Sequence, residues 1–213
     1  VASLRSPHTV SLYDFGVAQD GRLFLAMELL DGLDLESLVR RHGPLPAGRV
    51  VHLLRQACKS LEEAHARGLV HRDIKPSNIF ACRLGLTVDF VKVLDFGLVK
   101  ERQREDVRLT APARTAGTPA YMAPEMVREG AEVDHRADIY ALGCVAYWLL
   151  TGRMVFQGES AVDLLIQHLH DTPLPPSERG AFEIPTELET LVLACLAKDP
   201  ADRPQSAADL ARR

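Results

Sequence analysis

The feature that most constrains the fold of this chain is the segment at residues 134–151, which has helical character and is apolar nearly all round. A helix without a polar face has to be buried, so other elements must surround it. Gly152 follows directly and is expected to end this helix. A second, amphipathic helix is predicted at residues 46–67, with its apolar residues at helical spacing. The chain is therefore expected to build a helical body around one buried helix.

Strand signals come mainly before the helices. Two apolar runs near the start are joined by an Asp-Gly turn, which is a typical hairpin signal. A short helix is expected to begin near Leu33 and to end at Gly43. Strands at the N-terminal edge followed mostly by helices favour an α+β fold. The predicted strands are residues 9–13, 23–27, 79–81 and 90–94, and the further helices are residues 160–170 and 186–198.

The composition excludes several kinds of protein. Lys and Arg total 25 and Asp and Glu total 29, so the chain of 213 residues carries a formal charge of −4. This balance argues against a protein that holds nucleic acid or an anionic membrane surface through basic side chains. No apolar run reaches the ~18 residues that a membrane-spanning helix needs. No nucleic acid and no membrane contact are therefore expected for this chain.

The four cysteines, Cys58, Cys82, Cys144 and Cys195, lie far apart and show no metal-binding spacing. We interpret them as small buried residues in a reducing compartment. The predicted localisation is cytoplasmic, either for the whole protein or for the cytosolic part of a longer, membrane-anchored chain.

Three short segments carry the chemistry. Residues 71–78 read His-Arg-Asp-Ile-Lys-Pro-Ser-Asn, in a loop between a helix and a strand. Residues 95–97 read Asp-Phe-Gly and follow an apolar strand. After a long polar loop, residues 117–125 read Gly-Thr-Pro-Ala-Tyr-Met-Ala-Pro-Glu. Any one of these would be weak evidence, but their order and their settings together are specific.

In this order the segments resemble the catalytic loop, the metal-binding DFG sequence and the APE-containing substrate loop of eukaryotic-type (Hanks-type) serine/threonine protein kinases, in a bacterial-like style. The resemblance implies a protein-kinase-like α+β fold. Residues 1–30 would form the end of the small lobe and the hinge, and residues 31–213 the helical large lobe. The glycine-rich loop and the strand lysine of the small lobe are absent from this chain. We therefore expect a kinase truncated at the N-terminus, which alone has little activity.

The resemblance also assigns the reacting groups and implies ATP and Mg²⁺ as cofactors. Asp73 would orient or accept the proton of the attacking hydroxyl, and Lys75 would place an ammonium near the transferring phosphate. Asn78 and Asp95 would supply the oxygen ligands that Mg²⁺ prefers. Thr118 would contact Asp73 and Lys75, as in kinases that act on Ser and Thr.

The adenine of ATP would bind at the hinge. Glu28 and Leu30 belong to the hinge segment, whose backbone receives adenine in this family. Met27 would guard the back of the pocket and Phe80 would form its apolar floor, with plain core packing as the alternative for these two. The phosphate side of the cofactor site would be formed by Lys75, Asn78 and Asp95.

Regulation is implied for the long polar loop. Arg72 would face a phosphate on that loop, and Thr110 and Thr115 are the candidate phosphorylation sites. The alternative is that both threonines are simply exposed polar residues.

Three further residues have structural roles in the family. Asp138 would hold the backbone of the catalytic loop. Glu125 and Arg203 would form a buried ion pair that ties the substrate loop to the last helices.

Two other readings stay open. The first is a pseudokinase or scaffold that uses the kinase fold without turnover. The second is an unrelated helical interaction domain, which would require the motifs to be a coincidence. For the enzyme, the expected partners are ATP and protein substrates, and a regulatory homodimer is an open alternative to a monomer.

Overall fold

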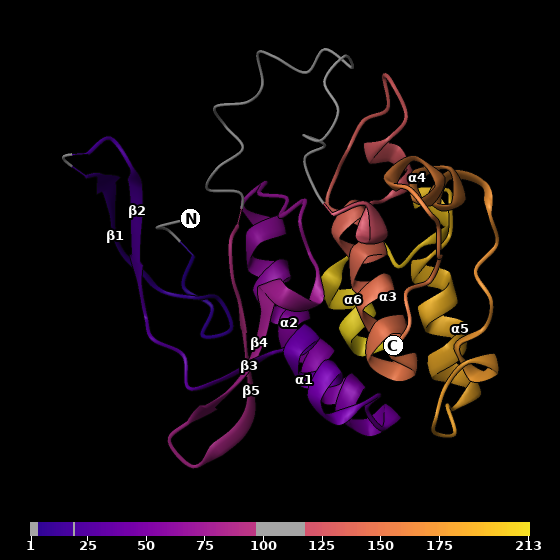
Figure 1. Ribbon diagram of the computed structural model, residues 1–213, viewed down its shortest axis with the longest axis horizontal. Coiled ribbons are helices and arrows are strands. Elements are labelled where there is room, and N and C mark those ends of the chain that lie inside the picture. The colour runs from indigo at the N-terminus through magenta and orange to yellow at the C-terminus, as the bar shows by residue number, and fades with distance from the viewer. Residues whose placement is uncertain (1–3, 19, 97–117) are drawn as a thin grey trace.

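The computed structural model of the protein describes residues 4–18, 20–96 and 118–213. Helices are the main regular structure of this part, and a hairpin of two strands lies beside them (Figure 1). The arrangement confirms the predicted α+β fold. The longer helices are α2 (Ala47–Ala66) and α3 (Arg136–Thr151), and the shorter ones are α1 (Leu35–His42), α4 (Ala161–His170), α5 (Thr186–Cys195) and α6 (Ala207–Arg212).

Helix α3 is the centre of the helical part. All of its residues except Arg136 and Trp148 are buried, as a helix without a polar face requires. Helices α2 and α5 both pack on it. A side chain on Gly143 would come within 2.7 Å of the Cβ of Cys195, so glycine lets α5 approach this closely. Gly152 ends the helix in the left-handed conformation, with φ of 67°.

Helix α2 carries the amphipathic pattern that the sequence predicts. Its buried face includes Leu53 and Leu61, neither of which is exposed at all.

The shorter helix α1 begins two residues later than expected. Its N-cap is Asp34, whose carboxylate accepts a hydrogen bond of 2.8 Å from the backbone N–H of Ser37. Such a cap satisfies one of the free N–H groups of the first turn.

The two N-terminal strands form an antiparallel hairpin, β1 (Leu12–Val17) and β2 (Leu23–Met27). The first strand, predicted at residues 9–13, begins three residues later, at Leu12, and runs to Val17. Thr9 instead bridges to Val93 in the second sheet, and the N–H of Val10 donates to the carbonyl of Val93 at 3.0 Å. The residues before β1 are therefore used to join the two sheets.

The second sheet has the order β3-β4-β5 and consists of β3 (Gly32–Asp34), β4 (Ile79–Leu84) and β5 (Thr87–Val93). Strand β3 was not predicted, because three residues are too few for a periodic signal. The predicted runs at residues 79–81 and 90–94 are parts of one longer hairpin. Its turn contains Gly85, with φ of 60°.

Helix α5 is shorter than the predicted segment at residues 186–198. The carbonyl of Ala197 accepts a hydrogen bond of 2.8 Å from Nε of Arg203, and the carbonyl of Lys198 accepts one of 3.3 Å from its Nη2. The segment just past Cys195 is thus used to hold Arg203 and does not continue α5.

All four cysteines are free and buried, as predicted. Burial raises the pKa of the thiols of Cys58 and Cys195 to about 12, so both stay protonated at neutral pH. Within the described ranges, none of the helices has the length and apolar character needed to cross a bilayer.

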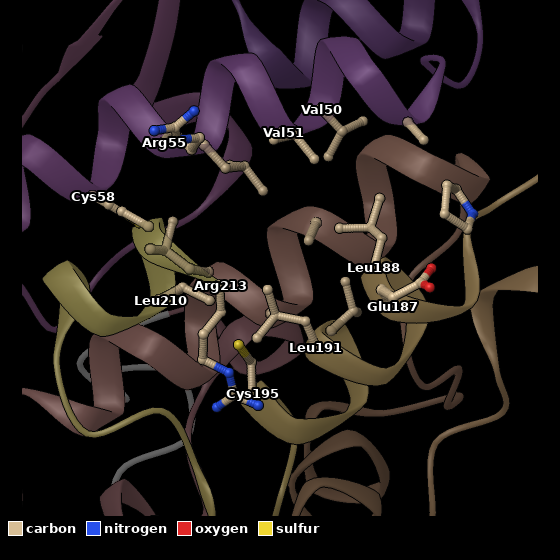
Figure 2. Close-up of a pocket in the computed structure, with 18 of the residues that line it drawn as sticks. Val50, Val51, Arg55, Cys58, Glu187, Leu188, Leu191, Cys195, Leu210 and Arg213 are labelled. Atoms are coloured by element: carbon tan, nitrogen blue, oxygen red, sulfur yellow. The ribbon is translucent and has the colours of Figure 1, made fainter.

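An apolar groove of about 500 Å³ lies between α2, α3, α5 and α6. Figure 2 shows Val50 and Val51 of α2 on one side of it and Leu188 and Leu191 of α5 on the other. None of the predicted site residues lines this groove.

Candidate active site

The catalytic loop is held by one buried carboxylate. Asp138, at the start of α3, is fully buried. It accepts hydrogen bonds of 2.8 Å from the backbone N–H of His71 and from that of Arg72. Arg72 has φ of 65°, a conformation that is costly for a non-glycine residue and has to be held in place. The carboxylate therefore fixes the backbone immediately before Asp73.

The side chain of His71 joins the catalytic loop to the end of β5. Its Nε2 lies 2.7 Å from the carbonyl of Leu94, and its Nδ1 lies 3.3 Å from the backbone N–H of Asp73. A carbonyl only accepts and an amide N–H only donates, so the proton of the neutral ring is on Nε2. The ring also contacts that of Phe96, with 4.7 Å between the centroids. These contacts fix the residues on both sides of Asp95.

Asp73, Lys75 and Thr118 form a compact polar group. Nζ of Lys75 lies 3.0 Å from Oδ2 of Asp73 and 3.2 Å from Oγ1 of Thr118. The side chains of Asp73 and Lys75 are each 25% exposed, so solvent and ligands can reach them. One ammonium therefore connects the catalytic loop with the residue that begins the described part of the substrate loop.

Asn78 faces the same group from the short 3₁₀ helix at Pro76–Asn78. Its amide nitrogen donates to the carbonyl of Asp73 at 2.8 Å. This leaves Oδ1 as the atom of Asn78 that could bind a cation. The backbone N–H of Leu94 donates to the carbonyl of Asn78 at 2.9 Å, which brings the end of β5 next to it.

Asp95 lies directly after this contact. It is exposed and has φ of 58°, whereas the neighbouring Phe96 is buried. The carboxylate of Asp95 therefore lies at the surface, and the buried ring of Phe96 holds the chain in place beside it. Asp95 and Asn78 together offer the hard oxygen ligands, few in number, that Mg²⁺ accepts because it keeps most of its waters.

The residues predicted to form the hinge lie at and just after the end of β2. Met27, Glu28 and Leu30 are all partly exposed. Oε1 of Glu28 lies 2.7 Å from Nζ of Lys92 in β5 and accepts a bond of 2.7 Å from the N–H of Ser11. Burial raises the pKa of Glu28, but these two bonds outweigh burial and lower it overall. The side chain of Glu28 is thus used to fix the hinge to β5.

Phe80 lies on β4 and pairs in register with Lys92. It is partly exposed. The ion pair of Lys92 with Glu28 thus links the strand that carries Phe80 to the hinge segment.

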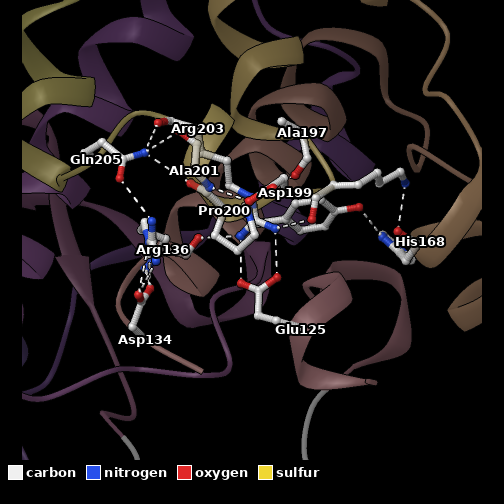
Figure 3. Close-up of polar contacts among 12 residues, drawn as sticks. Glu125, Asp134, Arg136, His168, Ala197, Asp199, Pro200, Ala201, Arg203 and Gln205 are labelled. Carbon is white, nitrogen blue, oxygen red and sulfur yellow. Dashed lines mark hydrogen bonds and ion pairs between the residues drawn. The ribbon is translucent and has the colours of Figure 1, made fainter. Parts of the chain in front are cut away.

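Glu125 and Arg203 form a buried ion pair (Figure 3). Two nearly parallel bonds of 2.7 and 2.8 Å join the carboxylate to the guanidinium, and their side chains are 6% and 0% exposed. Arg203 also donates to the carbonyl of Arg136 at 3.0 Å and lies over the ring of Tyr140. The pair ties the 3₁₀ helix at Pro124–Met126 to the start of α3 and to the C-terminal helices.

The structure leaves part of the predicted site undescribed. Thr110 and Thr115 lie outside the described residues. Arg72 is partly exposed and adjoins the catalytic group. In the described part of the chain, no cluster of three or more His, Cys, Asp or Glu side chains could hold a metal ion.

Sequence reasoning missed His65 and Lys92. Nε2 of His65 lies 2.8 Å from Oδ2 of Asp138, which makes it a third partner of the carboxylate that holds the catalytic loop. The signal was a polar residue four positions after Leu61, on the apolar side of a helix. Lys92 was similarly a charged residue within an otherwise apolar strand.

The comparisons with known proteins agree with this geometry. The sequence matches the protein kinase domain family over residues 1–212. It is 44% identical over 207 residues to the serine/threonine-protein kinase pkn3 of Myxococcus xanthus, covering 96% of this chain and 38% of that protein. It is 39% identical over 212 residues to PknB of Mycolicibacterium smegmatis, covering 98% of this chain and 33% of that protein.

Solved structures give the same result. The kinase domain of PknI from Mycobacterium tuberculosis superposes with a TM-score of 0.72 at 28% identity, over 99% of this chain and 71% of that one. Rad53 in complex with AMP-PNP gives a TM-score of 0.77 at 29% identity, over 98% of this chain and 50% of that one.

A fold with this catalytic loop and this buried ion pair defines a protein kinase domain, and the chain belongs to that family. Within it, the chain falls with the bacterial serine/threonine kinases of the Hanks type. The chain spans 38% and 33% of the lengths of these two curated relatives.

Proposed function

We propose that the protein is an ATP-dependent serine/threonine protein kinase. The observation that carries the proposal is the ammonium of Lys75, which lies within 3.2 Å of both Asp73 and Thr118. A carboxylate, a cation and a hydroxyl held together in this way suit transfer of a phosphoryl group to a hydroxyl. A chain that only served as a scaffold would have no chemical need for this group beside Asn78 and Asp95.

In the proposed reaction, the hydroxyl oxygen of a Ser or Thr in the substrate attacks the γ-phosphorus of ATP. A new P–O bond forms, the bond from the γ-phosphorus to the β,γ-bridging oxygen breaks, and ADP leaves with that electron pair. The carboxylate of Asp73 takes the hydroxyl proton. The ammonium of Lys75 stabilises the negative charge on the transferring group.

The residues present also fit Mg²⁺. When bound, Mg²⁺ neutralises charge on the phosphate oxygens. Asp95 would hold it through its exposed carboxylate and Asn78 through Oδ1. His71 and Phe96 fix the backbone on both sides of Asp95, so the chain itself orients this ligand.

The nucleotide would bind at the hinge. The backbone of residues 28–30 would receive adenine, with Met27 and Phe80 against the ring, and Thr110, Thr115 and Arg72 would serve regulation. This assignment divides the chain into the end of a small lobe at residues 1–30 and a large lobe at residues 31–213. The cytoplasmic localisation and the regulatory homodimer stay predictions.

The test is phosphotransfer by the full-length protein with ATP and Mg²⁺. Three peptides that differ only in having Ser, Thr or Tyr as the acceptor should separate the specificities. We expect the Ser and Thr peptides to be phosphorylated and the Tyr peptide not. Transfer to none of them, despite ATP binding, would favour the scaffold.

A further inference from the structure

A second concave site lies on the outer face of α2, away from the group formed by Asp73, Lys75 and Thr118. It is a groove of about 580 Å³. Its α2 residues recur at helical spacing, so they share one face of the helix. We call it the basic groove and define it by His8, Val51, His52, Arg55, Lys59 and Phe90.

The floor of the basic groove is apolar. The rings of His8 and Phe90 are stacked, with 4.7 Å between their centroids and 25° between their planes. Val51 is 38% exposed and adds apolar surface beside these rings. Gln56, at the edge, is engaged with β5 and donates to the carbonyl of Asp89 at 2.9 Å. A ligand would thus meet apolar surface on the floor.

The rim is cationic, with the exposed carboxylate of Glu62 three residues after Lys59 on the same helix. Arg55 and Lys59 are exposed, and neither forms an ion pair within the described part of the chain. The nearby carboxylate of Asp89 is already held by two bonds of 2.8 and 2.9 Å from Arg49. Glu63, one turn beyond Lys59, accepts from the N–H groups at the start of the described chain.

The positive charge of the rim comes from Arg55 and Lys59. Burial lowers the pKa of His8, and the charges of Lys59 and Lys92 act in the same direction, so His8 is neutral at pH 7. The chain as a whole has a formal charge of −4. A positive rim is therefore a local feature of this face.

We propose that the basic groove is a docking site for an acidic segment of a protein substrate. Carboxylates of the segment would pair with Arg55 and Lys59, and an apolar side chain between them would lie on Val51 and Phe90. Two cations one turn apart on α2, beside an apolar hollow, fit a short peptide better than a polyphosphate backbone, whose binding needs many phosphate contacts. The proposal rests on the proposed kinase function, because it supplies the recruitment of that enzyme's substrate.

Binding can be measured without any turnover. The probe is a fluorescein-labelled peptide of alternating Glu and Asp with one central Leu, titrated with the full-length protein and followed by fluorescence anisotropy. We expect saturable binding that R55E/K59E weakens at least about tenfold. The matched control R41E/R83E makes the same charge change at two exposed arginines outside the groove and should leave the affinity within about twofold.

Several results would overturn the proposal. Binding that the control variant weakens as much as R55E/K59E does would mean a general charge effect. Equal affinity for the same peptide with Leu replaced by Gly would remove the role of the apolar floor. Stronger binding of a DNA duplex or of phosphatidylserine vesicles than of the peptide would assign the groove to another class of partner.

A kinetic measurement separates this proposal from the proposed function. One substrate is a short acceptor peptide, and the other is the same peptide linked to the acidic segment. R55E/K59E should raise KM for the linked substrate to that of the short one, while kcat/KM for the short peptide stays unchanged. If the unmodified protein phosphorylates neither peptide, only the kinase function is contradicted. If it phosphorylates both peptides with equal KM values, only the docking site is contradicted.

Discussion

The buried carboxylate of Asp138 accepts a hydrogen bond of 2.8 Å from the backbone N–H of His71. The same carboxylate bonds the N–H of Arg72 and Nε2 of His65. It therefore orients the catalytic loop from inside the helical body, without touching the reacting atoms. We propose that Asp138 is a positioning residue, whose effect on activity follows from the loop geometry.

Replacing Asp138 by Asn should reduce kcat about 100-fold, because an amide can accept from only one side and its NH₂ group repels a backbone N–H. The affinity for ATP should change much less. The measurement is steady-state phosphotransfer by the full-length protein. Asp134→Asn, at a partly exposed carboxylate just before α3, is the matched control, and an equal loss in that variant would contradict the positioning role.

Replacing Thr118 by Val should lower kcat about tenfold, since Val keeps the shape but loses the hydroxyl that accepts from Lys75. Thr118→Ser keeps the hydroxyl and should retain most of the activity. The assay is phosphorylation of a Ser peptide at saturating ATP. If Val and Ser variants behave alike, the contact between Lys75 and Thr118 has no role in turnover.

Removing one partner of the Glu125–Arg203 pair should lower the free energy of unfolding by about 3–5 kcal/mol, because the other charge stays buried without its partner. Urea denaturation of Glu125→Gln and Arg203→Met measures this. The double variant should cost less than the sum of the two single variants. Strict additivity would show that the two groups do not interact.

His168 predicts a pH dependence of stability. It is fully buried, and its Nδ1 lies 2.8 Å from the hydroxyl oxygen of Tyr140. Burial, with a smaller effect of Lys198, lowers its pKa from 6.5 to about 4. Between pH 6.5 and pH 4, His168 binds a proton in the unfolded chain but stays neutral in the folded chain. The contribution of the neutral ring to the stability of the fold is therefore complete above pH 6.5 and is lost as the pH falls toward 4.

The expected loss from His168 between pH 7 and pH 5 is about 2 kcal/mol. Urea denaturation of the unmodified protein and of His168→Gln at both pH values isolates it, because the variant lacks the titrating ring. The variant should lose correspondingly less stability on acidification. The same loss in both proteins would mean that His168 does not resist protonation.

The parts of the fold that could be predicted are those marked by a periodic pattern of apolar residues. The apolar segment at residues 134–151 became the central helix, and the helix at residues 46–67 was correct to within one residue at each end. The boundaries that failed depend on long-range partners. Thr9 pairs with a strand far along the chain, and the residues just past the end of α5 accept hydrogen bonds from Arg203.

The candidate site shows the same division. The residues of the catalytic loop could be named because their types and order resemble those of a known kinase family. His65 and Lys92 could not, because each acts through a partner more than sixty residues away in the sequence. The basic groove was likewise hidden, since its cations on α2 gain meaning only beside His8 and Phe90.

The most direct test of the account is the Asp73→Asn variant of the full-length protein. Transfer of the γ-phosphate to a Ser peptide and binding of a fluorescent ATP analogue are measured on the same preparation. The account predicts that transfer falls by about 10²–10⁴-fold while the affinity for nucleotide stays within about threefold. Retained transfer, or an equal loss of nucleotide binding, would contradict the role of Asp73 as the group that takes the hydroxyl proton.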